Sequence, residues 1–373
     1  MRSASIPEEE SYHEARQLDF SDGDHDKIEV ATPRPLRNSA FIFVKPHACN
    51  DIVKDHLLQK LTAAGMVVRH EIDISGRHMD TIIDQHYYAI SQKAVTLTPS
   101  KLQNVPTNNF YKFFGETWAG ALANNTLLNA KEASEKLELT AEELYQIWKQ
   151  AESAGKICKM GGGFYVGMLI ASDDKTYYVV NGFYLRLKEQ FTSPSSMVHG
   201  VEVEWDPAEM SWKEFRQNFL GCTDPKKAAP NSLRRDLYDR FQEFCLSQEP
   251  NVSDNCVHAS ASPLEALSEK HNWLGGASAQ STSLTASGTK WTIRRDPFGR
   301  ALISQGLTEH LLTQEFFLDP VVTLPGGTQK MSLFDAVEDT NTQECLDLLV
   351  AVYDLQLEQA KNAGESSCSC ILL

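Results

Sequence analysis

The sequence predicts an α+β fold: a ferredoxin-like antiparallel sheet with helices on one face, an inserted α/β module and a C-terminal extension. Two observations predict it. Strand-like and helix-like segments follow one another as β-α-β-α-α-β-α-α-β-α once residues 92–181 are set aside. The residues set aside have their own pattern, an Ala-, Glu-, Lys- and Leu-rich stretch before a Gly-Gly-Gly turn.

Length and composition are those of an ordinary folded protein of two or three domains. The chain has 373 residues, of which 42% are hydrophobic and 23% charged. Its net charge of −15 argues against general binding to nucleic acid or to an acidic membrane surface. The eight cysteines are scattered without a Cys-x-x-Cys pair, which is typical of free thiols in a reducing compartment. We therefore expect a cytoplasmic location and no nucleic-acid partner.

The first ordered segment is expected after a polar, acidic leader at residues 1–36. The main domain follows over 37–275, interrupted by the insert. It opens with a buried strand, an amphipathic helix, a second strand rich in β-branched residues and a second helix. These are expected at 41–44, 52–61, 66–75 and 82–88.

Inside the insert the pattern predicts a loop containing Pro99 and Pro106, two short helices and a small sheet. The helices are expected within 127–154, and the strands near 156–160, 164–170 and 176–180. The main domain then resumes with helix, strand, two helices, strand and helix. These are expected at 183–191, 198–205, 211–220, 233–246 and around 258–275.

A C-terminal extension is expected over 276–363 and a flexible tail over 364–373. A Ser/Thr/Ala-rich linker opens the extension. A strand pair and two helices follow it. They are expected near 291–304, 307–316 and 342–361.

The chain is organised around His258, which lies just before a predicted helix. Ser262, Pro263 and Glu265 have the form of a capping box with proline at the first helical position. Free backbone N–H groups at a helix N-terminus favour negative charge. A histidine held there is placed to receive a phosphoryl group. Taken alone, it is more often a partly buried histidine with no role.

Five motifs in register resemble the nucleoside diphosphate kinase family. Their order and spacing agree across about 39–91 and 182–275. The motifs are Lys45-Pro46, His86-Tyr87, Leu220-Gly-Cys-Thr223-Asp-Pro225, Ala229-Pro230-Asn-Ser-Leu-Arg234-Arg-Asp236 and Asn255-Cys-Val-His258-Ala-Ser260-Ala-Ser262.

The resemblance implies a ping-pong reaction in which His258 takes the terminal phosphate of a nucleoside triphosphate and passes it to a nucleoside diphosphate. Glu269 would orient His258, and Phe183 would stack on the base. Mg²⁺ would be the cofactor, held through the nucleotide phosphates and not by protein ligands. The resemblance also allows a homo-oligomer. The remaining phosphate and ribose contacts would come from Lys45, Tyr87, Arg216, Thr223, Arg234 and Asn255.

Departures from the family pattern keep a second interpretation open, a catalytically impaired nucleotide-binding adaptor at a membrane. The family's Lys-Pro-Asp reads Lys45-Pro46-His47 here, and its His-Gly-Ser-Asp-Ser loop reads His-Ala-Ser-Ala-Ser. Where the family has its first phosphate-binding arginine, this sequence has Gln217, and Arg216 is the residue before it. The insert falls between Tyr87 and Phe183. Whether Lys45, Arg216, Arg234 and His258 converge on one open pocket discriminates between the two interpretations.

The last residues have the form of a lipidation signal. Cys370, followed by two aliphatic residues and Leu373, fits a prenylation box of the geranylgeranyl type. One prenyl chain gives a reversible anchor, and Cys368 is available for palmitoylation as a second signal. The sequence shows no signal peptide and no apolar run long enough to span a membrane. We therefore expect a peripheral protein on the cytoplasmic face of a membrane.

Overall fold

The computed structural model describes residues 36–171, 175–275, 290–327 and 329–362. Apart from Leu36, the predicted leader lies outside the described residues. The predicted linker, the tail and its two lipidation cysteines, Cys368 and Cys370, also lie outside them. Within the described part of the chain, no helix is both long and apolar enough to cross a bilayer.

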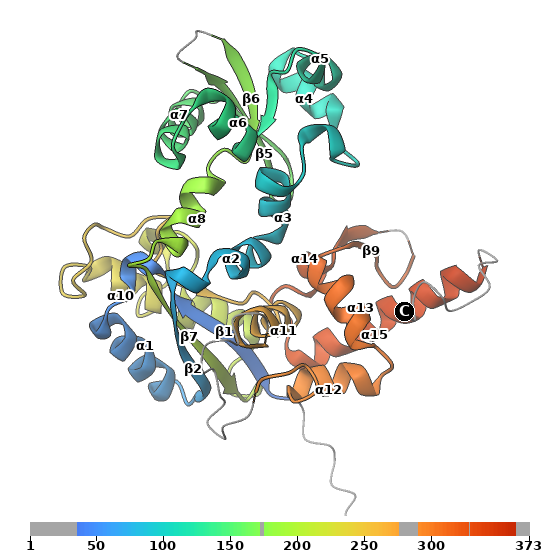
Figure 1. The fold of residues 1–373 in the computed structure, drawn as a ribbon. Coiled ribbons are helices and arrows are strands. Elements are labelled where there is room, and N and C mark those ends of the chain that lie inside the picture. Colours follow the sequence, from blue (N-terminus) through green and yellow to red (C-terminus); the bar gives the residue numbers. More distant parts are fainter. Residues whose placement is uncertain (1–35, 172–174, 276–289, 328, 363–373) are drawn as a thin grey trace, which may run out of the picture. The chain divides into compact units, whose positions relative to one another are not determined.

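The main sheet has four strands in the order β2-β7-β1-β8, and every neighbouring pair is antiparallel (Figure 1). Numbered as the first to fourth strands of this sheet, the order is 2-3-1-4, which is the order of a ferredoxin-like fold. The predicted fold class is therefore confirmed. The strands are β1 (Asn38–Val44), β2 (Val67–Ser75), β7 (Met197–Trp205) and β8 (Val257–Ala259).

One face of this sheet is covered by the helices that connect its strands. Alternate residues of β1 point to this face, where Ile42 and Val44 join a buried cluster with Leu57 and Trp212. The first of these helices begins where the Asn50 side chain accepts the Val53 N–H. The helical segments are α1 (Asp51–Ala63), α9 (Trp212–Glu214), η5 (Phe215–Leu220) and α10 (Leu233–Asp239).

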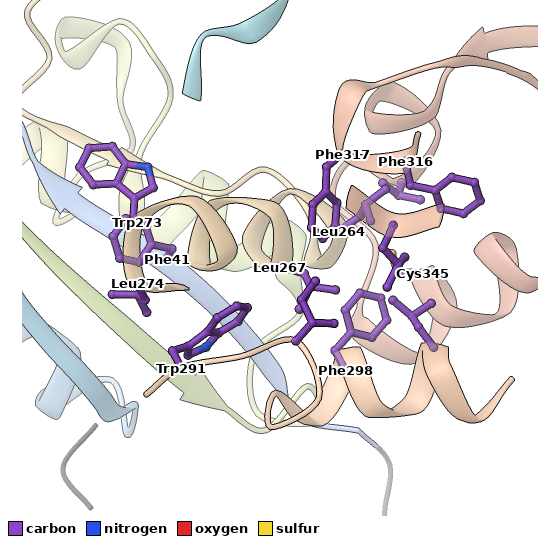
Figure 2. Close-up of a cluster of buried hydrophobic side chains, with 14 of the residues drawn as sticks. Phe41, Leu264, Leu267, Trp273, Leu274, Trp291, Phe298, Phe316, Phe317 and Cys345 are labelled. Atoms are coloured by element: carbon purple, nitrogen blue, oxygen red, sulfur yellow. The ribbon is translucent and has the colours of Figure 1, made fainter. Parts of the chain in front are cut away.

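The other face of the sheet is covered as well, so helices lie on both faces and not on one as predicted. Phe41 and Phe43 point to this face and pack with Leu264, Leu267 and Trp273. Figure 2 shows the helix that carries Leu264 and Leu267 beside Phe298, Phe317 and Cys345 of the extension. The segments on this face include α2 (Asp80–His86), α11 (Pro263–Lys270) and η7 (His271–Gly275).

The insert folds around its own four-stranded sheet, in the order β3-β6-β5-β4. Asn181, the last residue of the insert, links the two ends of the insert. Its side-chain amide donates to the carbonyl of Ile90, just before the insert, at 3.0 Å and to that of Gly163, within it, at 2.9 Å. Two helices were not predicted, α4 (Thr107–Phe114) and α5 (Trp118–Ala123). The other elements of the insert are β3 (Leu127–Asn129), α6 (Ala130–Leu137), α7 (Ala141–Ser153), β4 (Ile157–Gly161), β5 (Phe164–Ile170) and β6 (Thr176–Val180). The insert is preceded by α3 (Tyr88–Ser91) and followed by α8 (Tyr184–Thr192).

The extension packs on the core as a set of helices and one short hairpin. The predicted strand pair near 291–304 is wrong. Asp296 there accepts the N–H groups of Phe298 and Gly299 and starts a helix with Pro297 in its first turn. The elements are α12 (Pro297–Ser304), α13 (Glu309–Gln314), β9 (Val321–Thr323), β10 (Lys330–Ser332), α14 (Leu333–Val337) and α15 (Thr342–Asn362).

Candidate functional site

His258 is the middle residue of β8 and lies directly opposite Phe43 of β1. Their rings stack with centroids 4.7 Å apart. Because neighbouring strand residues point to opposite faces, the imidazole points to the face that α11 covers. There its Nε2 lies 2.5 Å from Oε1 of Glu269. The side chain keeps 21% of its surface exposed, so one edge of the ring is accessible.

The Glu269 carboxylate is positioned by a hydrogen bond from Ser260, which is itself bonded to β1. The Ser260 hydroxyl donates to its Oε2 at 2.6 Å and accepts the Phe41 N–H at 3.0 Å. The carboxylate side chain is only 5% exposed. Its Oε1 is therefore fixed toward His258 by a hydrogen bond on its other oxygen. Sequence reasoning missed the role of Ser260, although its place two residues after the histidine was visible.

A second histidine completes the cluster. His86, at the end of α2, has its Nδ1 3.4 Å from the same Oε1 of Glu269. Its ring stands edge-on to that of His258, with centroids 4.7 Å apart. Its side chain is 5% exposed. The sequence placed His86 in a motif but suggested no role for it.

The imidazole of His258 is neutral at physiological pH. Burial and the positive charges of Lys45, Arg234 and Arg216 together lower its pKa to about 3, against the opposing effect of Glu265. All three cations therefore lie within electrostatic reach of the ring. If Nε2 carries the proton and donates it to Glu269, Nδ1 keeps a free lone pair. Among the described residues, no hydrogen bond engages that Nδ1.

Lys45 follows directly after β1, beside the strand of His258. Its backbone N–H donates to the Cys256 carbonyl at 2.8 Å, and its ammonium donates to the Ser253 carbonyl at 3.2 Å. Burial, and then the charge of Arg234, lowers the pKa of Lys45 to about 8. This amine is therefore available to a negatively charged ligand and is poorly solvated.

Arg234 is buried and bonded to backbone carbonyls. Its Nη1 donates to the Gly221 carbonyl at 2.8 Å, and its Nε and Nη2 donate to the Val257 carbonyl at 3.2 and 2.8 Å. Burial, and then Arg216, lowers its pKa to about 10. The side chain connects the loop after η5 to β8 and leaves two of its five N–H donors for another partner.

Arg216 is already paired with carboxylates of the extension. Its Nη1 lies 2.6 Å from Oε1 of Glu338 and 2.7 Å from Oδ1 of Asp339. The Asp339 backbone N–H donates to the Ala261 carbonyl, three residues after His258, at 3.0 Å. The extension therefore reaches the edge of the site. No sequence signal pointed to this contact, because these residues are more than 120 positions apart in the chain.

The capping box after His258 forms only in part. The Ser262 hydroxyl accepts the Glu265 N–H at 3.1 Å, as predicted. The Glu265 carboxylate bonds to the Ala261 N–H, in the loop beside His258, and not to the backbone of Ser262. Burial, and then Glu269, raises the pKa of Glu265 to about 7. Sequence reasoning identified Glu265 as a capping residue and missed its place in the site.

Of the other residues predicted to contact the nucleotide, some lie beside His258 and some do not. Tyr87 is partly buried next to His86, and burial, then Glu269, raises its pKa. Asn255 donates to the Thr223 carbonyl at 3.2 Å, and its buried Oδ1 has no hydrogen-bond partner among the described residues. Thr223 itself is exposed.

Phe183 lies apart from this group. Its ring packs against Trp148 and Tyr165 of the insert, with centroids 5.6 and 6.0 Å apart, in the insert's own hydrophobic cluster. The side chain is half-buried there. Among the described residues it makes no ring contact with His258 or His86.

Two cavities flank the site. One, of about 240 Å³, is lined by His86, Tyr87, Glu265 and Glu269, with Phe317 of the extension. The other, of about 790 Å³, is lined by residues that include Pro46, His47, Arg186, Gln190 and Asp254. The larger cavity begins one residue after Lys45 but does not contain the catalytic candidates. The hydrogen-bonded cluster around His258 therefore locates the chemistry better than cavity size does.

Comparison with known proteins gives one partial sequence match. A nucleoside diphosphate kinase from Rubrobacter xylanophilus is 42% identical over 60 residues, which are 16% of this chain and 37% of that protein. The match thus spans well under half of the relative's length. No family profile matches the chain.

Solved structures of the same family are also similar, at low identity. They include kinases from Encephalitozoon cuniculi (13% identical, 64% of this chain and 90% of that one, TM-score 0.31) and Pyrobaculum aerophilum (17%, 64% and 96%, 0.31). TM-scores this low do not establish a shared fold, which here depends on the strand order of the sheet. In its motifs and in the matched segment, the chain resembles the nucleoside diphosphate kinase family, as predicted.

Proposed function

We propose that the chain transfers the terminal phosphate of a nucleoside triphosphate to a nucleoside diphosphate through a phosphohistidine at His258. The arrangement of groups around the His258 ring carries the proposal. Nε2 of His258 is bonded to a buried carboxylate, and Nδ1 has no hydrogen-bond partner within the described residues. The positive charges of Lys45, Arg234 and Arg216 are close enough to lower the pKa of the ring. The partial match to a nucleoside diphosphate kinase supports the same class of chemistry.

In the first step the lone pair of His258 Nδ1 attacks the terminal phosphorus. The N–P bond forms as the bond to the bridging oxygen breaks, and that electron pair leaves with the nucleoside diphosphate. The ring becomes positively charged, and Glu269 accepts its Nε2–H at 2.5 Å. A second diphosphate then attacks the phosphorus and takes the group. The carboxylate thus stabilises a charge that exists only while the reaction proceeds.

Positively charged groups of the site would neutralise the negative charge of the nucleotide phosphates. Lys45 and the two free N–H donors of Arg234 are placed to bind phosphate oxygens, and Asn255 has a buried oxygen in need of a donor such as a ribose hydroxyl. Mg²⁺, when bound to the nucleotide, neutralises the phosphate oxygens. Asp254, close enough to raise the pKa of Lys45 against the effect of burial, is a hard oxygen ligand of the kind that this ion accepts.

The test uses the full chain, γ-labelled ATP and Mg²⁺, followed by an assay for acid-labile, base-stable phosphate. We expect label on the native chain, none on His258→Gln, and loss of the label when GDP is added. His199→Gln is the matched control, because His199 is another buried histidine paired with a carboxylate, Asp73, at 2.9 Å. Absence of label from a chain that binds ATP would overturn the proposed transfer.

One observation favours the second function, a nucleotide-binding adaptor without transfer. Glu338 and Asp339 neutralise Arg216, the arginine nearest the family's phosphate-binding position. A chain that binds ATP with full affinity, gives no phosphohistidine and still gives none after these carboxylates are removed would have this function. The homo-oligomer, the cytoplasmic membrane location and lipidation at Cys370 and Cys368 stay predictions.

A further inference from the structure

Three potential metal ligands meet at the back of the His258 ring. Nε2 of His258 and Nδ1 of His86 approach the same oxygen, Oε1 of Glu269, at 2.5 and 3.4 Å. All three ligand atoms lie within 4.8 Å of one another. One carboxylate oxygen between two imidazole nitrogens is an unusual arrangement if its only purpose is to orient His258, because His86 adds nothing to that task.

We propose that His86, His258 and Glu269 bind a transition-metal ion of the zinc class. Two imidazoles and one carboxylate are a ligand set that suits Zn²⁺ and Co²⁺ and is poorly suited to Mg²⁺. Around a tetrahedral zinc ion, with bonds of about 2.1 Å, ligand atoms lie about 3.3 Å apart. The separation between His86 and Glu269 already has this value, and the hydrogen bond between His258 and Glu269 opens by less than about 1 Å to reach it.

The surroundings favour a metal site in two further ways. The Ser260 hydroxyl holds Oε2 of Glu269 at 2.6 Å, which is the outer hydrogen bond that orients a metal-bound carboxylate. His86, Glu265 and Glu269 also line the cavity of about 240 Å³, which has room for a water molecule as fourth ligand and for entry of the ion.

This site does not depend on the proposed phosphotransfer. The ion binds at Nε2, on the opposite side of the imidazole from Nδ1, and needs no nucleotide. A chain that transfers no phosphate would still bind it. The metal and the phosphate are therefore tested separately, and the failure of one leaves the other in place.

The experiment titrates the metal-free full chain with Co²⁺, without nucleotide, and follows its visible absorption. We expect one ion per chain with the intense absorption of tetrahedral cobalt, displaced by Zn²⁺. In His86→Gln the affinity should fall by more than about 100-fold, since a lost ligand costs more than a lost outer partner. His86→Cys, which supplies a thiolate, should restore binding and add a sulfur-to-cobalt charge-transfer band.

His199→Gln is again the matched control. His199 is 2% exposed, and its two nitrogens lie 2.9 Å from Asp73 and 3.7 Å from Glu71. This variant should bind Co²⁺ like the native chain. Native absorption without tetrahedral intensity, or equal affinity in the native chain, His86→Gln and His199→Gln, would overturn the metal site. Thermal unfolding of each variant verifies that a lost signal is not a lost fold.

Discussion

Oδ1 of Asp339 lies 2.7 Å from Nη1 of Arg216, and its neighbour Glu338 lies 2.6 Å from the same nitrogen. Arg216 is one of the three cations that lower the pKa of His258. Two carboxylates on one guanidinium nitrogen have the charge and the hydrogen-bonding capacity of a bound phosphate group. The extension therefore occupies a position that a nucleotide phosphate would also favour.

Freeing Arg216 should strengthen nucleotide binding. We expect Glu338→Gln combined with Asp339→Asn to lower the Kd for ATP about tenfold, roughly 1.4 kcal/mol, because the arginine no longer has to leave two carboxylates. Isothermal titration calorimetry measures the effect. Asp335→Asn is the control, since Asp335 is exposed on α14, the helix that ends just before Glu338, and forms no ion pair within the described residues. Equal affinity in the native chain and the double variant would show that Arg216 does not contact nucleotide.

The rate of phosphohistidine formation should rise with pH. Burial raises the pKa of Glu269 to about 8, so its carboxyl is neutral below that pH and ionised above it. Only the ionised form stabilises the positive ring of phosphorylated His258. The unphosphorylated ring, with a pKa lowered to about 3, stays neutral over this pH range and does not contribute to the profile. Single-turnover labelling at saturating ATP between pH 6.5 and 9 should therefore show an increase with its midpoint near 8.

Lys45 provides the internal check on this profile. Its pKa is lowered to about 8 by burial, so it loses its charge over the same pH range and nucleotide binding should weaken. The effects of the two groups can be distinguished, because the charge of Lys45 changes the Kd for ATP and the charge of Glu269 changes the rate at saturating ATP. Glu269→Gln should flatten the rate profile and reduce the rate at pH 9 by about tenfold or more. An unchanged midpoint in this variant would contradict the role given to Glu269.

Phe183→Ala should destabilise the insert. The ring is half-buried against Trp148 and Tyr165, so its loss should lower the free energy of unfolding by about 2 kcal/mol. Urea denaturation followed by tryptophan fluorescence measures this change. Tyr145→Ala, at a half-buried position of α7 outside this hydrophobic cluster, is the comparison in the same module. If Phe183 instead stacked on the base, its removal would raise the Kd for ATP with little loss of stability.

The main sheet could be predicted because its strands carry strong local signals. The residues of the first strand are apolar on both of its faces. The motif around His258 indicates where a strand ends and a helix begins. The resemblance implied a place for Glu269 beside His258, and the structure has Glu269, 11 residues after His258 on the following helix, with its Oε1 2.5 Å from Nε2. Local pattern was sufficient for these elements, and it failed near 291–304, where a helix replaces the predicted strand pair.

The remaining features depend on contacts between distant residues. The helices α4 and α5 were missed because Pro99 and Pro106 mark a loop, and the packing of Phe110 against Trp118 stabilises helix nearby. The predicted helix 233–246 ends at Asp239. The pairing of Arg216 with the extension, and the approach of His86 to Glu269, bring together segments more than 100 positions apart. No periodicity or spacing encodes such contacts.

A buried ion pair joins the extension to the core, in addition to their shared hydrophobic cluster. Lys270 of α11 is 1% exposed, and its ammonium lies 2.5 Å from Oδ2 of Asp296, before α12, and 3.3 Å from Oε1 of Glu202. Asp296→Ala removes this carboxylate and also the cap of α12, and leaves a buried cation with one partner fewer. We expect the free energy of unfolding to fall by about 3–5 kcal/mol, measured by denaturant titration.

The exposed pair between Arg294 and Glu309, at 3.1 Å, supplies the control in the same region. Glu309→Ala should change the free energy of unfolding by no more than about 1 kcal/mol, because surface ion pairs contribute little. If the two variants lost stability equally, burial would not be the source of the effect. A fall confined to Asp296→Ala, reduced in the charge-free double variant Lys270→Met with Asp296→Leu, would identify the unpaired buried charge as the cause.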